Sequence, residues 1–155
     1  MRRITFRIPR SYKYFLFSLI LVSWTTGVTF YYLSNWGAME GDFGSQKHPA
    51  EFPLLMTHGA AAFLMILSFG GLLASHIPSA WKLERSRYLG LTMVTLVAFQ
   101  MLSAYLLYYV AWEEARPVIA NLHAAVGFSL PFFLLTHVLI GKKNRKPDGN
   151  EKKLQ

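Results

Sequence analysis

The stretch HGAAAFLMILSFGGLLASH, residues 58–76, contains no charged residue and has a histidine at each end. A second stretch, HAAVGFSLPFFLLTH at residues 123–137, has the same form. Ionisable side chains at membrane depth are rare and are usually functional. On an α-helix, the histidine spacings of 18 and 14 residues advance about 27 and 21 Å and return to within roughly 40° of the same face. Each stretch therefore predicts a helix with one imidazole near each side of a bilayer.

Segments without Asp, Glu, Lys or Arg occur four times, at residues 14–33, 52–81, 88–112 and 117–141. Each reaches the roughly 20 residues that span a hydrocarbon core. Hydrophobic residues make up 53% of the 155-residue chain and its mean hydropathy is +0.28, which is too apolar for an ordinary soluble domain. Pro78 disfavours helical geometry at the preceding residue, so we expect the second helix to end at His76.

We therefore predict an all-α fold, a four-helix transmembrane bundle formed by residues 1–141. Its helices are expected at about 14–33, 52–76, 88–112 and 118–140, followed by a flexible basic tail at 142–155. The loop before the second helix is turn-rich and polar, and its His48 is predicted to be a surface histidine. Gln100, within the third helix, is expected to form hydrogen bonds between helices.

The net charge of +8 is unevenly distributed. The basic residues lie before residue 14, between residues 82 and 87, and after residue 141, whereas the other two loops contain only Lys47 and Arg116. By the positive-inside rule, both termini are predicted to be cytoplasmic, in what we expect to be a bacterial inner membrane. Basic segments beside a membrane usually contact anionic lipid headgroups, so the charge predicts lipid contact and no nucleic-acid binding.

In this topology the second and fourth helices run parallel and their histidines form two facing pairs, His58 with His123 outside and His76 with His137 inside. Neutral imidazole is a strong ligand of haem iron, and two axial histidines leave no open coordination position, which suits electron transfer. Structural zinc would need about four ligands within roughly 2.0 to 2.3 Å, whereas each end supplies two histidines. The four histidines are therefore predicted to ligate the iron of two b-type haems. The chain has no cysteine, which excludes iron–sulfur clusters held by cysteine and covalent haem attachment.

Small residues lie one turn from the outer histidines, as a flat macrocycle between two helices requires. Ala62 and Gly127 occupy the i+4 positions relative to His58 and His123. The corresponding inner positions are bulky: Leu72 and Phe133.

Arginine side chains are available for haem propionates at both surfaces. Arg116 lies on the predicted outer side and Arg87 on the inner side, near Lys82 and Arg85. Arginine pairs with carboxylates through its two-pronged geometry. The same residues serve equally to set the topology.

The histidine pattern resembles that of respiratory cytochromes b and of the integral diheme subunits of membrane hydrogenases and formate dehydrogenases. In respiratory cytochromes b, two parallel helices each supply two histidines; the 14-residue spacing is matched by His123 and His137, whereas His58 and His76 are 18 apart. Residues 48–81 and 104–138 are also similar to a group of small bacterial four-helix membrane proteins. The resemblance implies two non-covalent b haems, one near each surface, that pass electrons across or into the membrane.

Three functions stay open from the sequence. The first is a membrane electron carrier that exchanges electrons with a quinone pool or a redox partner protein, more a subunit of an oxidoreductase than an enzyme alone; we assign it no catalytic residue. The second is a haem-free membrane anchor or assembly subunit, whose histidines bond neighbouring helices. The third, a proton or metal-ion transporter, is disfavoured because no acidic residue lies within the predicted helices.

Overall fold

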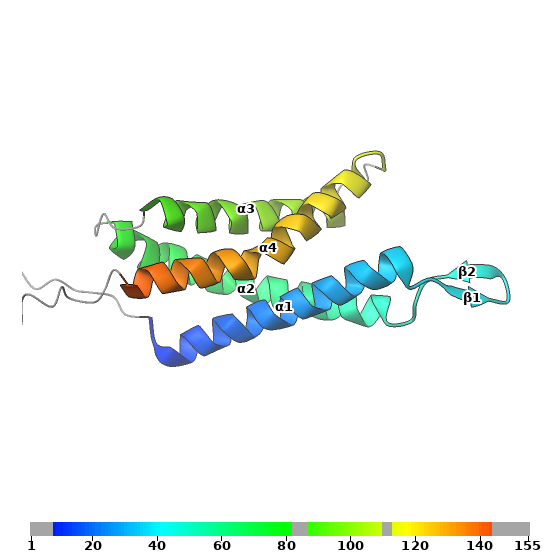
Figure 1. The fold of residues 1–155 in the computed structure, drawn as a ribbon, viewed down its shortest axis with the longest axis horizontal. Coiled ribbons are helices and arrows are strands. Elements are labelled where there is room, and N and C mark those ends of the chain that lie inside the picture. The colour runs from blue at the N-terminus through cyan, green and yellow to red at the C-terminus, as the bar shows by residue number, and fades with distance from the viewer. Residues whose placement is uncertain (1–7, 82–86, 110–112, 144–155) are drawn as a thin grey trace, which may run out of the picture.

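The protein is described by a computed structural model that covers residues 8–81, 87–109 and 113–143. Its helices are α1 (Arg10–Trp36), α2 (Glu51–Trp81), α3 (Arg87–Tyr109) and α4 (Arg116–Lys143), and the strands β1 (Met39–Gly41) and β2 (Gly44–Gln46) join α1 to α2 (Figure 1). All four helices are long and apolar enough to cross a membrane. The prediction of four long apolar helices is therefore confirmed.

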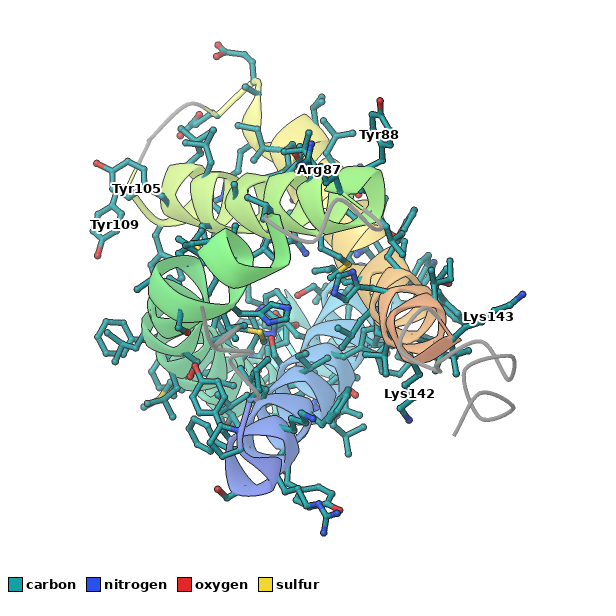
Figure 2. The ribbon with its side chains drawn as sticks, turned by 90° about the vertical axis from the view of Figure 1, so that its left-hand side faces the viewer. Arg87, Tyr88, Tyr105, Tyr109, Lys142 and Lys143 are labelled. Atoms are coloured by element: carbon teal, nitrogen blue, oxygen red, sulfur yellow. The ribbon has the colours of Figure 1, made fainter. Side chains whose placement is uncertain are left out.

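The four helices form a bundle in which neighbours along the chain run in opposite directions (Figure 1). Seen end-on in Figure 2, the order around the bundle is α1, α2, α3, α4, and α2 lies diagonally opposite α4. Among the described residues, no Cα atom of α2 comes within 8 Å of a Cα atom of α4. The two helices that carry the histidine pairs thus run parallel and face each other across the centre of the bundle.

Polar contacts fix how α1 packs against α2. The hydroxyl of Tyr12 donates to the carbonyl oxygen of Ser68 at 2.6 Å, near the start of α1. At the other end of the same helix, the hydroxyl of Ser34 donates to Oε2 of Glu51 at 3.0 Å. Lipid tails are as apolar as leucine, so contacts of this kind specify helix partners better than apolar packing does.

Helix α1 also packs against α4, through aromatic residues. The indole nitrogen of Trp24 lies 3.4 Å from the carbonyl oxygen of Phe128, and the rings of Tyr31 and Phe128 meet edge to face at 5.5 Å. The hydroxyl of Tyr31 donates to Oδ1 of Asn121 at 3.0 Å. Tyr105 and Tyr109 of α3 instead point away from the bundle (Figure 2), as aromatic residues near a membrane surface commonly do.

Helix boundaries differ from the sequence prediction in one instructive place. Helix α2 does not end at His76 but continues through Pro78 to Trp81. Proline removes one backbone donor and only biases the preceding residue against helix. In an apolar environment, the following peptide groups gain more by staying hydrogen-bonded in the helix than by unwinding, which explains the extension.

The other helices also extend beyond the predicted segments, at both ends of α1 and α4. The second internal proline, Pro131, lies in the middle of α4, where the helix changes direction (Figure 1). Loss of the bond to the carbonyl of Gly127 accounts for this bend. The predicted end of the third helix at 112, the residues Lys82 and Arg85, and the tail beyond 143 lie outside the described residues.

The polar loop between α1 and α2 is an ordered antiparallel hairpin. Gly41 pairs with Gly44, so Asp42 and Phe43 form a two-residue turn. Gly44 has a φ of 102°, a conformation that glycine adopts without strain. All residues of both strands are exposed, and the hairpin extends beyond the end of the bundle (Figure 1).

The charged residues separate between the two ends of the bundle. One end has the basic residues of the helix termini: Arg10, Lys13, Arg87, Lys142 and Lys143. No described residue at that end is acidic. The hairpin end has five acids, Glu40, Asp42, Glu51, Glu113 and Glu114, and only two described basic residues, Lys47 and Arg116. We call these the basic end and the acidic end.

A cap stabilises the start of α2. The backbone N–H of His48 donates to Oε1 of Glu51 at 3.2 Å, and Nδ1 of His48 accepts the backbone N–H of Ala50 at 3.1 Å. This is the reciprocal geometry of a capping box, with histidine in the place of serine or threonine. His48, predicted to be a surface histidine, is partly buried and serves as this cap.

Replacing Glu51 by alanine should therefore lower thermal stability. Glu51 is 9% exposed and its carboxylate accepts hydrogen bonds from Ser34 and His48, so its removal leaves two donors without their acceptor. We expect a loss of about 1 to 3 kcal/mol, seen as a lower melting temperature in detergent. Glu114→Ala, which removes an exposed acid at the same end, is the control and should melt like the wild type. Equal melting of both variants would contradict the capping role.

Candidate functional site

The structure brings the two outer histidines together across the bundle. His58 lies seven residues after the start of α2 and His123 seven residues after the start of α4, so the two side chains lie at the same depth. Their ring centroids are 6.3 Å apart and the ring planes are inclined by 80°. This contact joins helices whose backbones are far apart, and it is the feature on which the candidate site is built.

Helix α1 holds the ring of His58. Nδ1 of His58 lies 2.8 Å from the carbonyl oxygen of Ser23 and 3.5 Å from the hydroxyl of the same residue. One turn further along α1, Gly27 lies directly against the ring: a Cβ atom on this glycine would be 2.9 Å from Cε1 of His58. A side chain at Gly27 would displace the imidazole, so this glycine makes room for it.

Helix α3 holds the ring of His123 in a similar way. The hydroxyl oxygen of Ser103 lies 2.8 Å from Nδ1 of His123, and Ser103 is only 3% exposed. The hydroxyl oxygen of Ser103 also lies 2.8 Å from the carbonyl oxygen of Phe99 and 3.2 Å from that of Gln100. When the hydroxyl proton is donated to either carbonyl, the hydroxyl oxygen accepts from Nδ1 of His123; when Nδ1 carries no proton, the hydroxyl donates to it.

The partner of His58 determines where the proton of its ring lies. A carbonyl oxygen accepts hydrogen bonds only, so Nδ1 of His58 carries a proton. In a neutral imidazole with the proton on Nδ1, Nε2 is left with a free lone pair. Both rings of the outer pair are thus oriented through a contact at Nδ1. The neutral ring of His58 offers Nε2 as a basic nitrogen, and that of His123 does so when its Nδ1 donates to Ser103, which is the usual arrangement of metal-binding histidines.

The separation of the outer rings is compatible with a shared metal ion. Two imidazoles that bind one metal at about 2 Å through facing nitrogens have ring centroids roughly 6 Å apart. The observed 6.3 Å is close to that value. No group of three or more His, Cys, Asp or Glu side chains able to hold a metal occurs in the described part of the chain. Among the described residues, the outer pair is thus a site of two imidazoles with no third ligating side chain of these types beside them.

The small residues predicted beside the outer histidines lie where the sequence places them, but they are not equally accessible. Ala62 is partly buried on α2, one turn from His58. Gly127 is in contact with Gln100 of α3: the amide nitrogen of Gln100 lies 2.6 Å from where a Cβ on Gly127 would be. Oε1 of Gln100 is buried without a hydrogen-bond partner. A macrocycle resting on Gly127 would require the Gln100 side chain to move.

The inner histidines lie at the basic end of the same two helices. His76 is near the end of α2 and His137 near the end of α4, and both are partly buried. Nδ1 of His137 is buried without a hydrogen-bond partner. The inner pair therefore lacks, on the α4 side, the orienting contact that Ser103 gives to His123.

The two predicted propionate partners lie at opposite ends of the bundle. Arg116 is the exposed first residue of α4 and shares a helix face with His123, two turns further along. Arg87 is the first residue of α3, at the basic end (Figure 2). Each arginine is thus at the same end as one histidine pair.

No protein-family model, curated protein or solved structure matches this chain significantly. The resemblance to respiratory cytochromes b therefore stays a prediction, and the site is judged on its own geometry.

Three residues of the outer site were not singled out from the sequence: Ser23, Gly27 and Ser103. Each lies on α1 or α3, the helices without paired histidines. Serines in apolar helices usually bond to their own backbone, so they carry no specific signal. Gly27, a small residue in a membrane helix, indicates close helix contact but does not identify its neighbour.

Substituting Gly27 by alanine tests the contact with His58. The added methyl group would meet the imidazole, so we expect a loss of about 1 to 3 kcal/mol, measured by thermal unfolding in detergent. Gly90→Ala is the matched control, because a Cβ at Gly90 meets nothing within 4 Å. It should be neutral or slightly stabilising, since alanine favours helix. Similar melting of the two variants would show that Gly27 does not support the ring of His58.

Proposed function

We propose that this protein is a membrane electron carrier that binds two b-type haems through histidine pairs. His58 and His123 would bind the iron of an outer haem, and His76 and His137 that of an inner haem. The observation that carries the proposal is the outer pair: two imidazoles, each with a hydrogen bond at Nδ1, with centroids 6.3 Å apart across the bundle.

Electron transfer is the chemistry that suits such a site. Two axial histidines complete the coordination of haem iron and leave no position for oxygen or substrate. Haem would supply the redox centre, while the chain orients the imidazoles through Ser23 and Ser103 and limits access of water. No group of three or more His, Cys, Asp or Glu side chains that could hold a metal ion lies among the described residues, so the two histidines are the protein ligands that the proposal assigns to the outer iron. We therefore expect the chain to act with a quinone or a redox partner protein.

Charge separation supports an orientation in the membrane. The basic end has five described basic residues and no described acid, and it includes the start of α1 and the end of α4. By the positive-inside rule this end would face the cytoplasm of a bacterial cell, with both termini inside and the hairpin outside. Lysine and arginine at this end would contact anionic lipid headgroups.

Absorption spectra of the purified protein, oxidised and reduced, with haem quantified per chain, test the proposed function. The expected result is two low-spin b haems. His58→Ala and His123→Ala should each remove the same haem, and His76→Ala and His137→Ala the other, because each substitution deletes one of two axial ligands. His48→Ala is the matched control and should keep both haems, since His48 caps α2.

A colourless protein from haem-replete cells, still colourless after reconstitution, would reject the carrier. It would favour the alternative of a haem-free anchor or assembly subunit. If all four histidine variants kept the haem absorption of the wild type, the proposed pairing of the histidines would be rejected instead.

The orientation has an independent test, because the chain contains no cysteine. Ser45→Cys places a thiol in the exposed hairpin, and Ser11→Cys places one in the exposed first turn of α1. A membrane-impermeant maleimide applied to intact spheroplasts should label Ser45→Cys only. Both variants should react after permeabilisation, and labelling of Ser11→Cys in intact spheroplasts would contradict the orientation.

A further inference from the structure

The hairpin of β1 and β2 has an exposed aromatic ring at its tip. Phe43 is 97% exposed and lies in the turn between Gly41 and Gly44. The hairpin extends beyond the end of the bundle (Figure 1). We propose that the hairpin is a docking element for a soluble protein that has an apolar pocket for Phe43 and basic residues around that pocket. The inference concerns the surface outside the membrane and does not depend on the proposed haems.

Neither the turn nor the core of the protein requires a phenylalanine at this position. Tight turns favour Gly, Pro, Asn, Asp and Ser, which adopt the required backbone angles or bond to the backbone. Asp42 and Gly44 are residues of this kind, and Gly44 has the positive φ of 102°. The ring of Phe43 is almost entirely exposed, so it adds no buried apolar area to the fold. An aromatic side chain that fills a pocket on a partner is a common anchor of protein interfaces.

The hairpin is held in a defined position before any partner binds. At its base, the carboxylate of Glu51 accepts hydrogen bonds from Ser34 at the end of α1 and from His48 before α2. Within the hairpin, the side chain of Gln46 lies over Gly41, where a Cβ atom would be 2.5 Å from Cδ of the glutamine. A preorganised element loses little conformational entropy on binding, which favours association.

The membrane is a poor partner for the tip of the hairpin. The rings of Tyr31 and Tyr32 lie 6.0 and 5.9 Å from that of Trp36 at the end of α1, and such aromatic groups are typical of the membrane–water interface. The hairpin follows Trp36 and extends further from the bundle, so Phe43 lies on the water side of this group (Figure 1). Anionic headgroups would also repel the acids of the hairpin, Glu40 and Asp42.

Charge indicates which kind of protein fits this surface. The acidic end has four exposed acids, Glu40, Asp42, Glu113 and Glu114, opposed by Lys47 and Arg116 among the described residues. Opposite charge steers a partner to such a surface and suppresses wrong partners, so a basic surface fits. A second copy of the chain in the same membrane presents the same acidic end, because its basic end lies across the membrane, and like charges repel.

The size of the hairpin indicates a transient contact. Its strands have three residues each, whereas a stable interface involves roughly 20 to 30 residues a side. The hairpin therefore suits a soluble protein that binds and leaves, with the charges setting the rate of encounter and Phe43 setting the position.

Site-specific photo-cross-linking in intact cells that naturally produce the protein tests the inference. A benzophenone analogue of phenylalanine in place of Phe43 keeps an aromatic ring at the tip and reacts on irradiation with what lies against it. We expect one discrete protein adduct, joined through a segment rich in lysine or arginine, as read by mass spectrometry. The matched control has the same analogue in place of Phe63, which is 62% exposed on α2, and should give no adduct with that protein.

Charge variants show whether the adduct has the proposed chemistry. With the photoreactive residue in place, Glu40→Lys combined with Asp42→Lys should lower the yield about tenfold, because the basic partner is then repelled. Lys47→Glu should raise the yield. All three residues are exposed, so both variants should melt like the wild type in detergent. If the double variant melts lower, the result for Lys47→Glu decides.

Several outcomes would overturn the inference. Adducts with lipid alone, with a second copy of the chain, or no adduct at all would exclude docking of a soluble protein at Phe43. An adduct whose yield does not change with charge would exclude a basic partner. None of these outcomes bears on the histidine pairs, and a colourless protein would leave the docking surface unaffected, so the two proposals fail separately.

Discussion

The hydrogen bonds of the two outer imidazoles determine how the helices of this bundle are paired. His58 bonds α2 to α1 through the carbonyl of Ser23, and His123 bonds α4 to α3 through Ser103. Between helices in lipid there is little hydrophobic driving force, so interhelical hydrogen bonds and close packing at small residues decide which faces meet. The ring contact at 6.3 Å then connects the two helix pairs across the centre. Most other features of the structure follow from this arrangement.

The inside of the bundle is accordingly small and polar, and its outside is large and apolar. On α2, Ala61 and Ser68 are 5% and 8% exposed, whereas Phe63 and Leu67 are 62% and 60% exposed. Among the described residues, no large side chain is less than 2% exposed. A soluble domain would reverse this pattern to bury apolar area. A lipid environment explains this difference, because a large apolar side chain in lipid gains no hydrophobic free energy by moving to the centre of the bundle.

The sequence was sufficient for the four long apolar helices and for the approach of His58 to His123. These follow from charge-free segments and helical periodicity, which are local properties. The sequence did not identify Ser103 and Gly27, because the role of each depends on which residue of a neighbouring helix it contacts. It also misjudged the end of α2, where Pro78 is only a bias that the apolar environment overrides. The hairpin could not be read either, since a short polar loop is compatible with many turns.

Unsatisfied polar atoms lie close to the proposed sites. The buried side-chain atoms without a hydrogen-bond partner in the described residues are Oε1 of Gln100 and Nδ1 of His137. Each such atom costs roughly 1 to 3 kcal/mol, which a structure tolerates mainly where function requires it. Gln100 packs against Gly127, one turn from His123, and His137 is itself a proposed ligand. By contrast, the polar groups at the start of α2, far from the bundle centre, are paired. The two unsatisfied atoms therefore lie on α3 and α4, beside the proposed sites, where a bound cofactor would provide new contacts and require Gln100 to reorient.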